Sequence, residues 1–158
     1  MTDMVLDTVM YIVHSAFAAL WTGSVLFAVW SVLPLAMDGE VSPEAFGSIV
    51  SKLQWVTRGS AVLLFISGGH LAGTLYTAES LTGSGGGHLV LTMLALWLAL
   101  AATVEIGSAK AQRGIDEKKI REPARAARPF YLAAAVFAAG LLLVAGLLGV
   151  AGRYGLPF

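Results

Sequence analysis

Four long runs of apolar residues, separated by polar or charged segments, set the pattern of this chain. They cover about residues 5–35, 56–77, 88–107 and 129–152. A helix needs roughly 20 apolar residues to cross about 30 Å of hydrocarbon, and each run reaches that length. Lipid admits only helices or closed barrels. The pattern therefore predicts an all-α fold, an integral-membrane four-helix bundle in which residues 1–158 form a single membrane domain.

The three connections between the runs differ in composition. Residues 38–54 are predicted to hold a short interfacial helix, and the glycine- and serine-rich residues 79–87 a mobile loop. Residues 108–128 are rich in charged and polar side chains and are expected to extend the third helix beyond the membrane. Pro34 is expected to end the first helix, and Pro129 suits the first turn of the fourth.

The distribution of basic residues predicts the orientation. Seven of the ten Lys and Arg lie in the connection between the third and fourth runs. Lys52 and Arg58 lie around the first connection, and Arg153 is the only basic residue near the C-terminus. Because basic residues favour the cytoplasmic side, the bundle is expected to be N-out/C-out, multi-pass, in the plasma (cell) membrane. Trp55 and Tyr131 would then mark the inner interface.

The composition narrows the class of protein further. Hydrophobic residues make up 57% and charged residues 13% of the chain, against about 25% charged in soluble domains, so the expected partner is the lipid bilayer. A formal net charge of zero argues against a nucleic-acid partner. The chain has no cysteine, which excludes disulfides, thiolate catalysis, iron–sulfur clusters and c-type haem. The first run lacks a basic flank and is too long for a signal peptide, so we expect it to be retained.

Three histidines provide the main candidate chemistry. Ionisable residues within membrane spans are functional candidates by default. His14 lies about two turns into the first run and His70 about two turns before the end of the second, so both are expected roughly 9–12 Å below the outer surface. His88 begins the third run and is expected to be shallower, closer to an interfacial residue than to a ligand. Matched imidazoles on adjacent helices predict a metal site: haem iron, or a copper, zinc or nickel ion.

The neighbours of the first two histidines suit a flat cofactor. Phe17 and Trp21 share a helical face with His14 and could pack on a porphyrin. Gly69 and Gly73 flank the second histidine and could let a bulky ring approach the backbone. Each feature also has a structural alternative. A histidine can simply hydrogen-bond to a neighbouring helix, and the aromatic residues can pack in the core or face lipid.

Two charged residues lie outside this pair. Arg153 is the one cation expected on the outer side and could bind haem propionates, or act as an interfacial anchor. Glu105 lies near the cytoplasmic end of the third run. We expect it to pair with Arg58 or Arg128, the alternative being a role in proton relay.

The segment from His14 to Phe27 carries a resemblance to a known family. It reads HSAFAALWTGSVLF, with Trp21 and Gly23 in a Trp-x-Gly step. With Arg58 near the start of the second run and a basic stretch before the fourth, the chain resembles the CopD-like four-helix membrane domains. That resemblance implies a role in copper resistance or uptake. The chain is more distantly similar to HemJ-type proteins, which bind haem b and are associated with protoporphyrinogen oxidation.

The sequence thus favours a membrane b-type cytochrome. His14 and His70 would be the axial ligands of haem b, and electrons would pass near the outer leaflet to an unknown redox partner. The first alternative is a copper-binding or copper-transport protein of CopD type, using His14, Met10, His70 and His88. The others are a HemJ-like protoporphyrinogen oxidase and a structural subunit. Enzymatic activity and the oligomeric state stay open, although small-residue stripes would permit a homo-oligomer.

Overall fold

The computed structural model describes residues 2–115, 117 and 119–154, with the backbone alone at residues 2, 153 and 154. It is 93% helical. The elements are α1 (Thr2–Phe27), a π-helical turn η1 (Ala28–Val32), α2 (Leu33–Asp38), α3 (Pro43–Leu75), α4 (Ala78–Gly83), α5 (Gly85–Ile115) and α6 (Arg121–Tyr154). Four helical stretches are long and apolar enough to cross a membrane. The predicted all-α, multi-pass bundle is confirmed.

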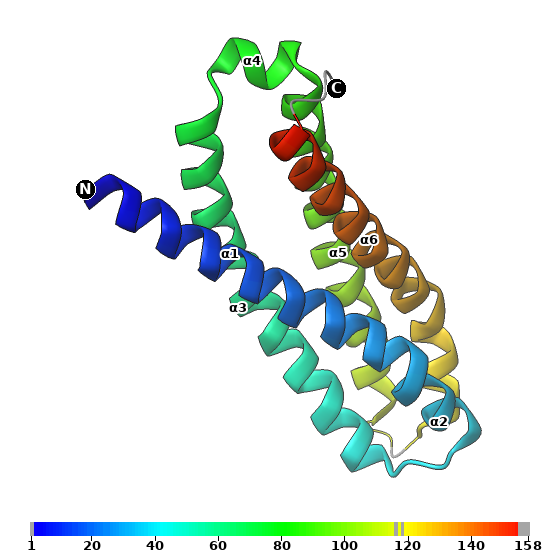
Figure 1. The fold of residues 1–158 in the computed structure, drawn as a ribbon. Coiled ribbons are helices and arrows are strands. Elements are labelled where there is room, and N and C mark those ends of the chain that lie inside the picture. Colours follow the sequence, from blue (N-terminus) through cyan, green and yellow to red (C-terminus); the bar gives the residue numbers. More distant parts are fainter. Residues whose placement is uncertain (1, 116, 118, 155–158) are drawn as a thin grey trace.

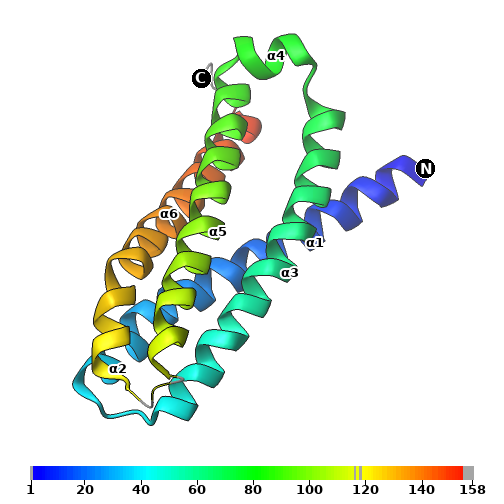
Figure 2. The same cartoon turned by 180° about the vertical axis from the view of Figure 1, so that it is seen from behind.

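The four long helices form an elongated bundle that opens at one end. α5 and α6 lie side by side, and α1 crosses the bundle obliquely (Figure 1). The end that carries α4 is the one expected outside, and we term it the outer end. There α3 and α5 diverge and α4 bridges them, while the start of α1 leans away (Figures 1 and 2). α2 lies at the opposite, inner end.

The predicted separate interfacial helix in residues 38–54 is wrong, because α3 runs unbroken from Pro43. The Ser42 hydroxyl caps its first turn by accepting a hydrogen bond from the Ala45 amide at 3.1 Å, and proline is favoured at that position. The reason for the continuity is a buried stripe of Phe46, Val50 and Leu53. Its spacing of four and three residues continues the face that enters the membrane.

The predicted mobile loop at residues 79–87 is also wrong, because α4 and the first turn of α5 fill it. Thr77 and Ser80 cap α4 reciprocally in a capping box. Gly87 packs so closely on α4 that a Cβ there would lie 2.3 Å from the Leu81 carbonyl oxygen. This glycine therefore allows a close backbone approach, whereas the sequence pattern indicated only flexibility.

The predictions for two prolines are wrong: Pro34 does not end the first helical stretch, and Pro129 does not lie in the first turn of the fourth. The chain passes from α1 through η1 into α2, where Pro34 is accommodated just after the wider π turn. α2 ends at Gly39, which has a φ of +77°. α6 starts at Arg121, so Pro129 lies inside it. The predicted extension of the third helix is confirmed, since α5 continues to Ile115.

The packed core occupies the inner half of the bundle. Its outermost buried members are Trp21 on α1, Ser67 on α3, Leu100 on α5 and Ala138 on α6. Beyond this level, Gly87 is the one buried residue in the part of the chain that the structure describes. Tyr131, expected at the inner interface, is instead 4% exposed and bonds to the Ser108 hydroxyl at 3.0 Å. The outer half thus has spans but almost no core of side chains.

Candidate functional site

His14 projects from α1 onto α3 at the outer limit of the core. Its Nδ1 lies 3.0 Å from the Ser67 hydroxyl oxygen, and that hydroxyl donates its single hydrogen to the Leu63 carbonyl at 2.6 Å. Because the bond to Leu63 is the shorter one, we assign the hydroxyl hydrogen to it, so that Ser67 accepts from His14 and the ring proton lies on Nδ1. Nε2 keeps its lone pair and has no hydrogen-bond partner among the described residues. This is the nitrogen that a metal could use.

A glycine makes the approach of His14 possible. A Cβ added at Gly68 would lie 2.9 Å from His14 Cε1 and 3.3 Å from Nδ1. Gly69 and Gly73, the glycines selected from the sequence, are exposed, and added Cβ atoms would meet nothing within 4 Å. The structure thus brings the His14 imidazole close to the backbone of α3 at Gly68. The approach of a cofactor ring at Gly69 and Gly73 stays a prediction.

His70 pairs with an acid that the sequence analysis did not place in the site. Its Nε2 lies 2.7 Å from Asp7 Oδ1, so Nε2 donates to the carboxylate and Nδ1 faces elsewhere. An acid so close to the start of a helix is already explained by the helix dipole. The spacing along the chain could have indicated its role, because Asp7 lies seven residues before His14, two helical turns away on the same face of α1.

The two histidines share one seam between α1 and α3. His14 contacts α3 at Ser67 and Gly68, while His70 contacts α1 at Asp7. At 1.5 Å per residue, these contacts place the rings roughly 5–10 Å apart along the seam. No group of three or more His, Asp or Glu side chains that could hold a metal ion occurs among the described residues. The structure therefore brings both rings to the α1–α3 seam, each with its own hydrogen-bond partner.

Four other residues were selected from the sequence: two lie in the core next to the seam, and two lie away from it. Trp21 is fully buried below it and donates its Nε1 hydrogen to the Thr57 hydroxyl at 3.0 Å, and Phe17 packs against the same core. His88 is exposed at the α4–α5 corner, with Nε2 2.7 Å from the Thr82 carbonyl oxygen. Arg153 belongs to the last turn of α6, and its side chain lies outside the described residues.

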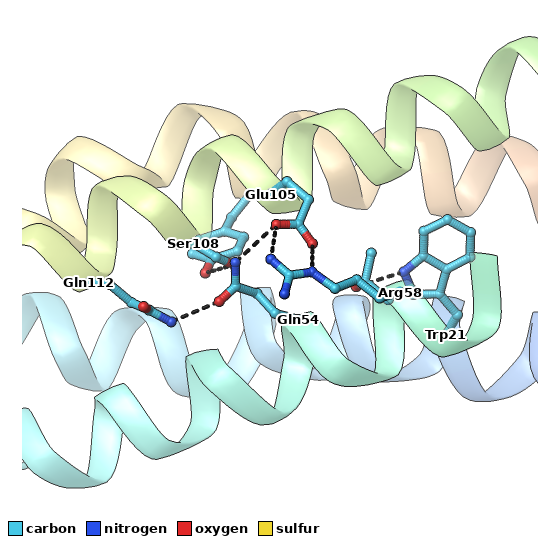
Figure 3. Close-up of polar contacts among 8 residues, drawn as sticks. Trp21, Gln54, Arg58, Glu105, Ser108 and Gln112 are labelled. Atoms are coloured by element: carbon cyan, nitrogen blue, oxygen red, sulfur yellow. Dashed lines mark hydrogen bonds and ion pairs between the residues drawn. The ribbon is translucent and has the colours of Figure 1, made fainter. Parts of the chain in front are cut away.

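A second polar cluster joins α3 to α5 in the inner half (Figure 3). Arg58 binds Glu105 through two parallel bonds, Nε to Oε1 and Nη2 to Oε2, both 2.8 Å. Gln54 donates to Glu105 Oε2 at 3.0 Å and accepts from Gln112 at 2.7 Å. The predicted pairing of Glu105 with Arg58 is confirmed. The two glutamines were missed, although Gln54 lies one turn before Arg58 and Gln112 two turns after Glu105.

This cluster acts as a clamp between two helices. A bidentate guanidinium–carboxylate pair is among the strongest hydrogen-bonded arrangements, and both carboxylate oxygens of Glu105 accept bonds. The Arg58 and Glu105 side chains are 58% and 35% exposed, so the clamp lies at the side of the bundle. Its donors and acceptors are arranged to hold α3 against α5.

The fold and the two clusters define a class: a multi-pass α-helical membrane protein with an outer histidine seam and an inner charged clamp. Comparison of the chain with family models, with curated proteins and with solved structures finds no match. The function must therefore be argued from the seam itself.

Proposed function

We propose that this chain is a membrane b-type cytochrome that holds haem b in its outer half through His14 and His70. It would transfer electrons near the outer leaflet of the plasma membrane to a redox partner not yet identified. The observation that carries the proposal is the state of His14. Its Nδ1 hydrogen is bound by Ser67, and its free Nε2 lies where the side-chain core ends. Ligating histidines commonly donate their second ring hydrogen in this way.

The lack of a core in the outer half supports the same proposal. Outward of Trp21, Ser67 and Leu100, the described side chains bury almost nothing. A porphyrin is a large, flat and mostly apolar group, and it would supply contacts there that side chains do not. Trp97 offers a donor near this boundary, since its buried Nε1 has no hydrogen-bond partner among the described residues.

His70 fits haem less simply than His14. Its Nε2 is bound to Asp7, so ligation through this nitrogen requires the bond to Asp7 to be given up. The absorption spectrum distinguishes whether His70 ligates the haem or keeps its bond to Asp7. Two histidine ligands give a six-coordinate, low-spin haem. If His70 keeps its bond to Asp7, His14 alone gives a five-coordinate, high-spin haem.

Copper binding is the second candidate, and the His70–Asp7 pair favours it. Imidazole nitrogen and carboxylate oxygen together suit copper(II), and the resemblance to CopD-like domains implies copper handling. The described residues gather two such side chains rather than three. A copper site would therefore need His14 to move along the seam toward the pair.

One preparation tests both candidates. The full chain is expressed with haem precursor supplied and purified, and its absorption spectrum is recorded oxidised and reduced, with iron and copper measured in the same sample. The cytochrome predicts a Soret band and stoichiometric iron, which His14→Ala abolishes and His70→Ala alters. His88→Ala, at the α4–α5 corner, is the matched control and should leave the spectrum unchanged. A wild-type protein with copper and no Soret band would replace the first candidate by the second.

A further inference from the structure

The inner ends of α5 and α6 carry five exposed cations. The ion pairs of the described residues join other side chains, so these five have no acidic partner there. We call them the inner basic surface: Lys110 and Arg113 on α5, and Arg121, Arg125 and Arg128 on α6.

Three of these cations line one face of α6. Arg121, Arg125 and Arg128 are spaced by four and three residues, so they follow one face of α6 over about 10 Å. Lys110 reaches this helix from α5, with its Nζ 5.2 Å from the centroid of the Phe130 ring. The ring covers the ammonium group on one side. Phe130 lies roughly opposite the three arginines around α6, so the cations flank this helix on two sides.

Charges at the inner end are layered along the bundle axis. The acids lie at the tip: Asp38 at the end of α2, Glu40 in the α2–α3 turn, Glu44 in the first turn of α3, Glu117 in the α5–α6 turn, and Glu122 beside Arg121 in the first turn of α6. Lys119 bonds to Glu117 at 2.8 Å, and this hydrogen bond holds the pKa of Glu117 below its usual range, so the pair cancels. Lys110 and Arg128 lie five and seven residues along their helices from this turn, about 8–10 Å deeper.

From the first turn of α6 inward, the order is therefore acid (Glu122), base (Arg125 and Arg128) and apolar span. It matches the order water, phosphate and hydrocarbon at a membrane surface. Unpaired cations at this depth fit lipid phosphate better than bulk water.

We propose that the inner basic surface binds the headgroup phosphates of anionic phospholipids in the inner leaflet. Basic clusters beside membrane helices bind anionic lipids, and Lys110 with the α6 arginines would fix such lipids along the α5–α6 edge. The proposal is independent of the outer histidine seam, so it holds whether or not haem is bound.

Native mass spectrometry of the full chain tests the proposal. The protein in neutral detergent is offered equal amounts of dioleoylphosphatidylglycerol and dioleoylphosphatidylcholine, and the bound lipids are counted. The wild type should retain the anionic lipid preferentially. Each cation near an anionic lipid changes binding by about fivefold. The triple variant R121Q/R125Q/R128Q should therefore lose on the order of a hundredfold of that preference, and R125Q alone about fivefold.

Lys119→Gln is the matched control, because it removes one positive charge from the same end but from a side chain paired with Glu117. It has the same net charge as R125Q and should keep the wild-type preference. Equal losses in the two variants, or a wild type that binds both lipids equally, would overturn the proposal. Displacement of the lipid by soluble glycerol phosphate would also overturn it, since a free phosphate ester would then be the ligand. If the triple variant does not fold, the comparison of R125Q with K119Q decides.

Discussion

The contact between Gly68 and His14 allows a sharp test of the histidine seam. In Gly68→Ala, the new Cβ would lie 2.9 Å from His14 Cε1, whereas carbon atoms pack best at about 3.5 Å or more. The ring must retreat by roughly 0.6 Å. That movement stretches the 3.0 Å bond from Nδ1 to Ser67 to about 3.6 Å, beyond the range of a good hydrogen bond.

The expected cost follows from these displacements. Losing the hydrogen bond costs about 1 kcal/mol, and residual crowding about 1–2 kcal/mol. The higher helix propensity of alanine returns about 1 kcal/mol. Gly68→Ala should therefore be about 1–2 kcal/mol less stable than the wild type. Gly69→Ala, whose Cβ meets nothing within 4 Å, should be up to about 1 kcal/mol more stable.

Unfolding in mixed micelles of dodecyl maltoside and sodium dodecyl sulfate, followed by circular dichroism, measures the difference. A double-mutant cycle with His14→Ala isolates the contact, because without the imidazole the alanine at position 68 has nothing to displace. The coupling free energy should be about 2–3 kcal/mol, because the cost of about 1–2 kcal/mol becomes a gain of about 1 kcal/mol when the imidazole is absent. A coupling near zero, or equal stabilities for Gly68→Ala and Gly69→Ala, would refute the assigned packing of His14 on α3.

Three further substitutions test the packing on either side of the seam. Glu105→Gln removes the charge that Arg58 binds and should cost about 1–2 kcal/mol; adding Arg58→Gln should recover part of it, and an unchanged single variant would contradict the clamp. Trp21→Phe should cost about 1 kcal/mol for the lost hydrogen bond beyond its packing loss, and less in a Thr57→Val background. Gly87→Ala places a Cβ 2.3 Å from a backbone carbonyl oxygen of α4, so it should cost about 3 kcal/mol and make the α4–α5 turn sensitive to proteases.

The sequence predicts the number and class of the helices because each apolar run sums many weak preferences over about 20 residues. It predicts the connections between the helices poorly. Charged residues in 43–55 conceal the stripe of Phe46, Val50 and Leu53 that continues α3, and the close approach of α5 to α4 at Gly87 depends on tertiary contact. Glu105 was placed correctly, because a lone carboxylate in an apolar run must find a cation.

The histidine seam shows a different limit. Successive residues on a helix differ by about 100° in direction, so small errors in rotation select the wrong neighbour. The sequence could therefore not distinguish a contact of His14 with Gly68 from one with Gly69. Asp7 was missed because an acid near a helix start already has an explanation in the helix dipole. The residue types of the seam could be recognised from the sequence. Their pairings could not be predicted, because they depend on how α1 and α3 are rotated about their axes relative to each other.

The clamp in the inner half and the histidine seam in the outer half have different roles in the bundle. The clamp of Arg58, Glu105 and the glutamines holds α3 to α5 where the core is packed, and the Trp21–Thr57 bond holds α1 to α3 just beyond it. With the inner half fixed, the outer helices can stay apart without unfolding. Disrupting the clamp should therefore lower the stability with little effect on any cofactor spectrum. His14→Ala should change the spectrum and, in the cofactor-free protein, cost only the roughly 1 kcal/mol of the bond to Ser67. If the clamp variants also changed the spectrum, the two halves would be one cooperative unit, and a core completed by a cofactor would no longer account for the open outer end.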